Sequence, residues 1–406
     1  MEAVEFMGTT DSKRDRLQVA AEQWTFPEGV VFLNHGSFGP TPACVLQARE
    51  KIQREHAANP MDFFLRKMEP MLDEACEQLA RFLNCPADNL VFVTNATAAM
   101  NIIAENLPLQ HGDEVLMTDH GYGAVTRVWG HYCQKAGAKT VLARLPEPVD
   151  TVEGIIEAIF EKVTPRTKLL VIDHITSPTA TIFPVAEITR RARERGLLVA
   201  IDGPHAVGMV DVDLQAIDCD FYAASCHKWV SAPLGSGFLY VRSRFKQGLR
   251  PNVVSWGRSV MGRPPSWKDE FHWPGTFDPS PWLAIPSALE FLKSYGVQRF
   301  RQETRELCQF AREQLLSIAG TEAVTPAGDE WSGTMVTVRL PISDAGQGPN
   351  QRHPLQNWLW DQYRIEIPIV RWHDDVHVRA SCHLYNTAEQ YTLLKQAIEE
   401  WMEESQ

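Results

Sequence analysis

A lysine near the middle of the chain stands where an enzyme could hold a covalent cofactor. Lys228 follows the apolar segment 221–224 through Ser225 and His227, and a loop containing Gly235 and Gly237 comes next. An amine at the end of a buried strand, beside small polar groups, is typical of a lysine that forms a Schiff base. A solvated surface lysine is the ordinary alternative, and this stretch alone leaves both interpretations open.

An acidic residue ends an earlier apolar segment. Residues 197–201 are aliphatic, and Asp202 follows them, directly before Gly203, Pro204 and His205. Ligands of α/β proteins bind at the carboxyl ends of strands. Pyridoxal phosphate chemistry needs a lysine to form the imine and a carboxylate to keep the pyridine nitrogen protonated. The order Asp202 then Lys228 therefore indicates such a site, although Asp202 alone could also cap a helix or form a turn.

Several motifs around these residues resemble one known family. They are D-G-x-H-A-x-G from Asp202, D-F-Y-x-x-S-x-H-K-W from Asp220 and P-x-G-x-G-F-L from Pro233, and they are similar to the class V aminotransferases of fold type I. L-N-H-G-S-F-G-P at 33–40, P-M-D-F-F-L-R at 60–66 and N-A-T-A-A-M-N at 95–101 most resemble the isopenicillin N epimerase-like branch. The resemblance covers nearly the whole chain and implies pyridoxal 5'-phosphate as the cofactor.

The resemblance also implies roles for individual residues. It places the cofactor phosphate at Ala96 and Thr97, where a turn of small residues before a helix offers free amide groups. The residues alone allow a simple helix cap at this turn. Tyr122 is expected to stack on the pyridine ring, and Arg379 to grip a substrate carboxylate with two parallel hydrogen bonds. Without the resemblance, both could be ordinary loop or surface residues.

The complete set of expected site residues spans most of the chain. Lys228, Asp202 and Tyr122 are expected to be catalytic. Arg379, Asn34, His35 and Ser37 are expected to bind the substrate, and no metal site is expected. Gly275 and Thr276 resemble an element that reaches the cofactor of a neighbouring subunit, which implies a homodimer with active sites at its interface. The expected cofactor contacts are Asn95, Ala96, Thr97, Tyr122, Asp173, Thr179, Asp202, His205, Ser225, His227, Lys228, Gly275 and Thr276.

The expected reaction takes place at the Cα of a small amino-acid substrate. Lys228 would form the internal aldimine, and its amine, once displaced by the substrate, would move the Cα proton. Reprotonation from the opposite face gives an epimerase or racemase, the outcome that the resemblance favours, with Tyr122 or His35 as the second acid or base. Elimination at Cβ gives a C–S β-lyase, and hydrolysis of a ketimine gives an aminotransferase.

Two other functions are less favoured by the residues present. A cysteine desulfurase needs a nucleophilic cysteine facing the substrate, and the segment 366–379, which ends at Arg379, contains none. Cys382 would point to the other face of the Arg379 strand. A non-catalytic protein that merely binds pyridoxal phosphate would tolerate loss of the lysine, the acid or the arginine, and this chain keeps all three.

The composition is that of an ordinary globular protein. The chain has 406 residues, of which 44% are hydrophobic and 22% charged. Its formal charge of −12 argues against binding to nucleic acid or to an anionic membrane. No apolar run approaches the length of a membrane span. The eight cysteines form no C-x-x-C pair, so we expect reduced thiols and a cytoplasmic protein.

Apolar segments that alternate with helical patterns position these residues. The alternation from about residue 89 to 203 predicts a parallel sheet covered on both faces. The connection 225–237 is barely long enough for a crossover and has no helical pattern, so the strand 238–241 is expected to be antiparallel. The predicted fold is α/β, fold type I, with a mostly parallel seven-stranded sheet and a smaller α+β domain. The expected division is an N-terminal segment 1–29, a large domain 30–280 and a small domain 281–406, with small-domain strands near 334–339, 365–367 and 377–381.

Overall fold

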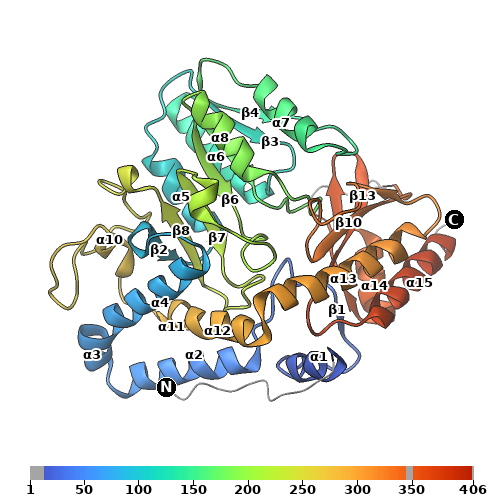
Figure 1. Ribbon diagram of the computed structural model, residues 1–406, viewed down its shortest axis with the longest axis horizontal. Coiled ribbons are helices and arrows are strands. Elements are labelled where there is room, and N and C mark those ends of the chain that lie inside the picture. The colour runs from blue at the N-terminus through green and yellow to red at the C-terminus, as the bar shows by residue number, and fades with distance from the viewer. Residues whose placement is uncertain (1–12, 344–350, 405–406) are drawn as a thin grey trace.

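The computed structural model describes residues 13–343 and 351–404; residues 1–12 of the expected N-terminal segment and 344–350 of the expected small domain lie outside it. Figure 1 shows a large α/β body joined to a smaller group of strands and helices that carries the C-terminus. The predicted α/β architecture is therefore present, and each part is held together by its own sheet.

Seven strands form the central sheet, in the order β2-β8-β7-β6-β5-β3-β4. All neighbours pair in parallel except β8, which runs antiparallel to both β7 and β2. The predicted sheet and its antiparallel strand are thus confirmed. The strands are β2 (Leu90–Val93), β3 (Glu114–Thr118), β4 (Lys139–Ala143), β5 (Thr167–Asp173), β6 (Leu198–Asp202), β7 (Phe221–Ser225) and β8 (Gly237–Val241).

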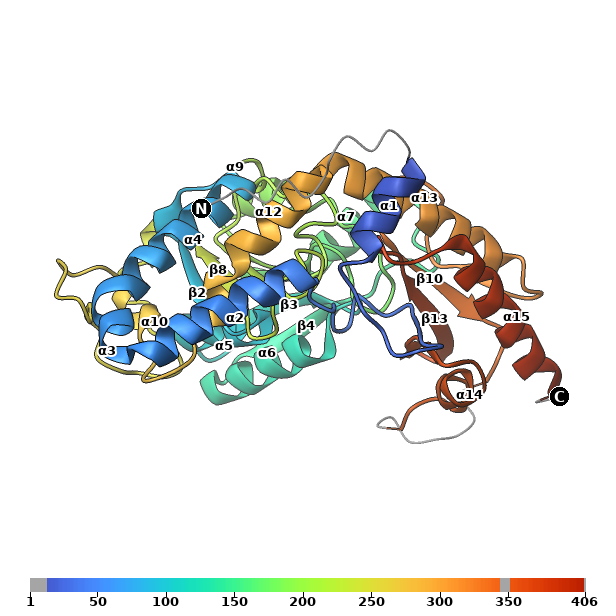
Figure 2. The ribbon, with the colours of Figure 1, turned by 90° about the horizontal axis from the view of Figure 1, so that it is seen from below.

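Helices cover both faces of this sheet because successive strand residues point to opposite sides. Val91 belongs to one apolar cluster with residues of α5 and α6, whereas Phe92 belongs to another with residues of α4, α7 and α8. Figure 2 shows α2, α4 and α12 packed together along one side of the large body. The helices are α2 (Ala43–Ala58), α3 (Pro60–Asp62), a π-helix (Phe63–Lys67), α4 (Met68–Phe82), α5 (Ala96–Asn106), α6 (Gly123–Ala136), α7 (Val152–Glu161), α8 (Val185–Glu194), α9 (Leu214–Ile217), α10 (Asp269–His272), α11 (Ser280–Leu283) and α12 (Ile285–Tyr295), with short 3-10 turns at Ala87–Asn89 and Ser243–Phe245.

The C-terminal part is built on a four-stranded antiparallel sheet in the order β12-β13-β10-β9. A third apolar cluster fills the space between this sheet and its helices. The expected strand at 365–367 is placed differently, because it pairs with the N-terminal β1 instead of joining this sheet. The elements are α1 (Lys13–Ala21), β1 (Val31–Phe32), α13 (Val297–Leu316), β9 (Glu322–Ala323), β10 (Met335–Leu340), α14 (Pro354–Tyr363), β11 (Ile365–Glu366), β12 (Ile369–Trp372), β13 (Asp375–Ser381) and α15 (Ala388–Glu404).

We propose the division into a large domain, 30–280, and a small domain, 281–406, after an N-terminal segment, 1–29. The third apolar cluster supports a separate small part, although α12 still packs within the first cluster. The β1–β11 pairing ties the first residues of the proposed large domain to the small one. Within residues 13–343 and 351–404, no helix is long and apolar enough to cross a membrane.

Candidate active site

A cavity of about 310 Å³ opens where β5, β6 and β7 end and α5 begins. The carboxyl edge of a parallel sheet is the usual ligand position in α/β proteins. Residues 36–38, after β1, and Arg379 of β13 complete the wall. Twelve of the expected site residues line the cavity: Ser37, Asn95, Ala96, Thr97, Tyr122, Asp173, Asp202, His205, Ser225, His227, Lys228 and Arg379.

Lys228 lies in the turn that follows β7, and its amine is enclosed in the cavity. Its Nζ lies 3.0 Å from Nε2 of His205. Burial, and then the positive charge of Arg379, lower the pKa of Lys228 to about 7, although the negative charges of Asp202 and Asp173 oppose the shift. A neutral amine is the nucleophilic form, so the cavity prepares this lysine for attack on a carbonyl.

We therefore expect Lys228 of the ligand-free protein to react with an amine-directed reagent half-maximally near pH 7, and faster as the pH rises. An exposed lysine would reach that point near pH 10.4. The labelling rate rises with pH because deprotonation creates the reactive form of the amine, and the lowered pKa moves this rise toward neutral pH. Mass spectrometry of peptides from protein labelled across a pH series measures the extent of labelling of Lys228, with exposed Lys135 as an internal reference. A half-maximum near that of Lys135 would contradict the prediction.

Two carboxyl groups form the acidic wall of the cavity. Asp173 and Asp202 end the parallel strands β5 and β6 as register partners, and both are buried. Burial raises the pKa of Asp202 to about 7, against the opposing charge of Lys228. Burial and then the charge of Asp202 raise the pKa of Asp173 well above its ordinary value. Oδ1 of Asp202 is buried without a hydrogen-bond partner among the described residues, so a ring N–H placed there would satisfy it.

The turn before α5 forms the opposite end of the cavity. Asn95 caps this helix through its Oδ1, which accepts a hydrogen bond of 2.9 Å from the amide of Ala98. The amide of Ala96 donates to Oγ of Ser225 over 3.0 Å. The helix dipole and the first amides favour an anion at this end. Gly237 allows the close packing, because a Cβ there would lie 2.9 Å from Cα of Asn95.

Arg379 reaches the cavity from β13 of the C-terminal part. Its Nη2 donates to Oγ of Ser37 over 3.0 Å, and its Nη1 donates to the carbonyl oxygen of Ser177 over 2.5 Å. Burial lowers its pKa to about 10, so the guanidinium remains charged at neutral pH. Its Nε is buried without a hydrogen-bond partner in the described part of the chain. A fixed, charged and incompletely satisfied guanidinium is suited to a carboxylate ligand.

Tyr122 stands at the mouth of the cavity. It is the N-cap residue of α6 and is 46% exposed. Its phenol lies close enough to Arg379 to raise the pKa of that group, against the larger effect of burial. The ring is therefore available to a ligand that enters the cavity.

Three expected site residues lie behind the cavity wall. His35 is fully buried and bonds the main chain of Lys228 rather than facing a substrate. Asn34 is buried beside it. Thr179 bonds Nδ1 of His120 over 2.8 Å, in a layer beneath the cavity. Each lies within two positions of a residue that does line the cavity, and sequence position alone cannot tell these neighbours apart.

Gly275 and Thr276 lie outside the cavity as well. They belong to the segment between α10 and α11, and their expected contact is with the cofactor of a second subunit. That contact stays a prediction, since it involves a second chain.

The sequence analysis missed several apolar wall residues. Phe38, Val125, Ile175 and Pro204 line the cavity beside the expected groups. Phe38 and Pro204 lie within the quoted motifs and could have been inferred from them. Val125 and Ile175 carry no chemical signature, because an apolar residue next to a strand or helix end is usually part of the core.

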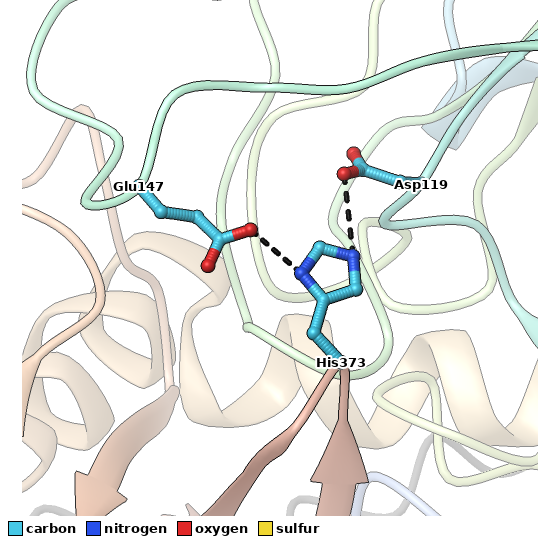
Figure 3. Close-up of side chains that lie close together, drawn as sticks. All are labelled: Asp119, Glu147 and His373. Atoms are coloured by element: carbon cyan, nitrogen blue, oxygen red, sulfur yellow. Dashed lines mark ion pairs between the residues drawn. The ribbon is translucent and has the colours of Figure 1, made fainter.

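A second group of titratable residues joins the two parts of the chain outside the cavity (Figure 3). His373, at the tip of the β12–β13 hairpin, places Nδ1 2.6 Å from Oε1 of Glu147 and Nε2 3.3 Å from Oδ2 of Asp119. The indole of neighbouring Trp372 donates to the carbonyl oxygen of Asp119 over 3.2 Å. One ligand atom of each residue lies within 4.8 Å of the others, and each carboxylate pairs with a different nitrogen of the ring. The group therefore serves as a contact between the hairpin and the loops after β3 and β4.

A lysine in a turn after β7, acids at neighbouring strand ends and an anion-binding helix start are together the arrangement of a fold type I pyridoxal phosphate enzyme. The comparisons are consistent with this class. The sequence profile of the Aminotransferase class-V family matches residues 31–348, so the chain belongs to that family of pyridoxal-phosphate-dependent enzymes. The family and fold expected from the motifs are confirmed.

Individual relatives are similar over nearly their whole lengths. The isopenicillin N epimerase of Amycolatopsis lactamdurans is 37% identical over 94% of this chain and 97% of its own. A probable chloroplastic L-cysteine desulfhydrase of Arabidopsis thaliana is 30% identical over 90% of this chain and 82% of its own. A solved C-DES mutant with glycine covalently linked to its PLP cofactor has a TM-score of 0.79 at 19% identity, over 96% of this chain and 99% of that one. The last likeness supports the fold alone.

Proposed function

We propose that this protein is a pyridoxal-phosphate-dependent epimerase or racemase that acts at the Cα of an amino-acid substrate. The observation that carries the proposal is the enclosure of Lys228, Asp202 and Arg379 around one cavity, although they come from distant parts of the chain. The 37% identity to an isopenicillin N epimerase supports the epimerase outcome. The cytoplasmic location stays a prediction.

The cavity residues fit the cofactor. Lys228 would hold it covalently, Asp202 would face its ring nitrogen, and the start of α5 at Ala96 and Thr97 would hold its phosphate. Tyr122 would stack on its ring. Bound pyridoxal phosphate supplies an electron sink for negative charge that develops at Cα. Oδ1 of Asp202 has no hydrogen-bond partner in residues 13–343 and 351–404, and this observation favours a protonated ring nitrogen at that place.

The remaining steps belong to the protein's own side chains. Arg379 would bind the α-carboxylate with two parallel hydrogen bonds and so fix the position of Cα. The Lys228 amine, whose pKa is about 7, is suited both to accept and to return the Cα proton at neutral pH. Inversion needs a second proton carrier. Of the two candidates, Tyr122 lines the cavity whereas His35 is buried behind it, so we propose Tyr122 for this role.

A C–S β-lyase is the second candidate, because the chain is also 30% identical to a probable L-cysteine desulfhydrase. A desulfurase is less well supported. None of the eight cysteines lines the cavity, and burial raises the pKa of the neighbouring Cys226 thiol to about 12. A thiol with such a raised pKa is a poor nucleophile at neutral pH.

The test is an incubation of the pyridoxal-phosphate-loaded enzyme with a panel of amino acids in deuterated water. Cα deuteration, inversion, keto acid and released thiol are scored separately by NMR, chiral chromatography and thiol titration. Inversion with deuterium incorporation supports the proposal. Thiol release without inversion identifies the lyase, and keto acid identifies an aminotransferase.

We also propose a homodimer with active sites at its interface. Large apolar side chains are exposed at Phe38, which lines the cavity, and at Met61, Val254 and Trp256. Such groupings mark protein–protein contacts. Sedimentation of the purified protein tests the proposal, and a monomer at all concentrations would contradict it.

Arg379→Lys is expected to raise KM for the amino-acid substrate about 10- to 100-fold with a smaller effect on kcat. Lysine keeps the charge but cannot make two parallel hydrogen bonds to a carboxylate. Steady-state kinetics measure the effect. Arg339→Lys is the matched control, because Arg339 lies on neighbouring β10 and pairs with Glu322 away from the cavity. Equal KM values for the two variants would contradict the role of Arg379.

A further inference from the structure

His35 holds the main chain of Lys228 from behind the cavity. Its Nε2 lies 3.0 Å from the Lys228 carbonyl oxygen, and its Nδ1 lies 2.8 Å from the hydroxyl of Tyr385. A carbonyl oxygen only accepts hydrogen bonds, so Nε2 carries the hydrogen and Nδ1 accepts from the Tyr385 O–H. Burial lowers the pKa of His35 to about 3, which keeps the ring neutral. The contacts therefore select one neutral tautomer.

The position of Lys228 depends on such tertiary contacts, because its turn belongs to no strand or helix. Two groups bond its carbonyl oxygen: the amide of Ser231, over 2.7 Å, and His35. The side chain leaves this main chain toward the cavity and meets His205. A small shift of the turn would therefore move the amine within the cavity, and displacements of about 1 Å can cost about 10²-fold in rate.

The same short segment also holds the arginine of the site. Two residues after His35, Oγ of Ser37 accepts a hydrogen bond of 3.0 Å from Arg379. Between them, the Gly36 amide donates to Oγ of Ser381 over 3.1 Å, and a Cβ at Gly36 would lie 2.8 Å from Sδ of Met335. The segment 35–37 thus packs tightly against the small-domain sheet while His35 bonds the Lys228 turn.

We propose that His35, held in one tautomer by Tyr385, is a positioning residue that sets the place of the Lys228 amine relative to Arg379. The proposal rests on the proposed function of Lys228 as the lysine that holds the cofactor. It differs from the expectation that His35 contacts the substrate. It also differs from an ordinary packing role, because a packing residue would alter stability without altering the environment of one amine.

The test compares His35→Leu with His35→Gln and Tyr385→Phe. Leucine removes the donor to Lys228, whereas the glutamine amide can still donate. His353→Leu is the matched control, since His353 is a buried histidine that caps α14 away from the cavity. Two readouts are taken: the dissociation constant for pyridoxal phosphate, and the pH profile of Lys228 labelling in the ligand-free protein. Asp173, Asp202, His205, His227 and Arg379 surround the amine and set that profile in all variants.

We expect His35→Leu to weaken pyridoxal phosphate binding about tenfold and to move the labelling profile to higher pH, because the displaced amine becomes more hydrated. His35→Gln should restore most of both properties, and Tyr385→Phe should cause a smaller change in the same direction. His353→Leu should lower the melting temperature without moving either readout. The proposal is overturned if His35→Leu behaves like wild type or like His353→Leu.

A further experiment distinguishes failure of the proposed function of Lys228 from failure of the proposed role of His35. Borohydride reduction of the loaded wild-type protein, followed by peptide mapping, shows whether the cofactor is attached to Lys228. Attachment elsewhere overturns the proposed function. Attachment at Lys228 with unchanged readouts in His35→Leu overturns only the role of His35. If His35→Leu does not fold, Tyr385→Phe is tested in its place. Wild-type values for its pyridoxal phosphate dissociation constant and its Lys228 labelling profile would overturn the proposal.

Discussion

Lys228→Ala is expected to abolish covalent attachment of pyridoxal phosphate and to lower kcat/KM by about 10²- to 10⁴-fold or more. The variant loses both the amine that would hold the cofactor and the group that would carry the Cα proton. His205 lies 3.0 Å from the amine in the wild-type protein, but its imidazole has no primary amine and so cannot form an imine in place of the lysine. Absorbance spectra and borohydride trapping measure attachment, and steady-state kinetics measure the rate.

Lys268→Ala provides the matched control. Lys268 is also buried, donates to the carbonyl oxygen of Ala87 over 2.7 Å and does not line the cavity. That variant should lose some stability but keep covalent attachment. If Lys228→Ala still shows an absorbance band of the attached cofactor that borohydride removes, another amine holds the cofactor.

Asp202→Asn is expected to lower kcat by about 10²- to 10³-fold. The neutral amide cannot stabilise a protonated ring nitrogen, so the cofactor would accept electrons less well. Binding of pyridoxal phosphate should fall less, because Ala96, Thr97 and Lys228 remain in place. Single-turnover kinetics and a binding titration separate the two effects.

A second measurement on this variant needs no cofactor. Asp202 releases its proton near pH 7 in the folded protein but near pH 4 in the unfolded chain, because burial raises its folded pKa. The contribution of Asp202 to stability therefore falls as the pH rises from about 4 to about 7. Relative to wild type, ligand-free Asp202→Asn should gain stability across that window. Asp220→Asn should instead lose stability, because buried Asp220 is paired with Arg242 and Arg244 outside the cavity.

The sequence was most informative where chemistry and strand ends coincide. Asp202 directly follows an apolar run and Lys228 follows another after three residues, and charged residues so close to the end of a buried strand are hard to explain by packing. The antiparallel β8 was predicted because residues 225–237 are rich in Gly and Pro and have no pattern of a crossover helix. Both inferences use local patterns that the folded chain preserves.

Inferences that depend on tertiary pairing were weaker. Residues 365–367 were read as a strand, but nothing local shows that this strand pairs with β1 while Ile369–Trp372 joins the small sheet. His35 and Ser37 look alike in the motif, yet one lies behind the cavity and the other lines it. Apolar wall residues such as Ile175 cannot be recognised from the sequence, because the same side chains are equally common in the core.

The pairing of β1 with β11, and of Ser37 with Arg379, has a consequence for biosynthesis. Val31 emerges from the ribosome more than three hundred residues before its partner Ile365. A nascent chain can fold much of the seven-stranded sheet, but its catalytic pocket stays open until the last tenth of the polypeptide has been translated. Contacts of such long sequence separation fold slowly, so a truncated transcript should yield an inactive product even when every residue of the lysine loop is present.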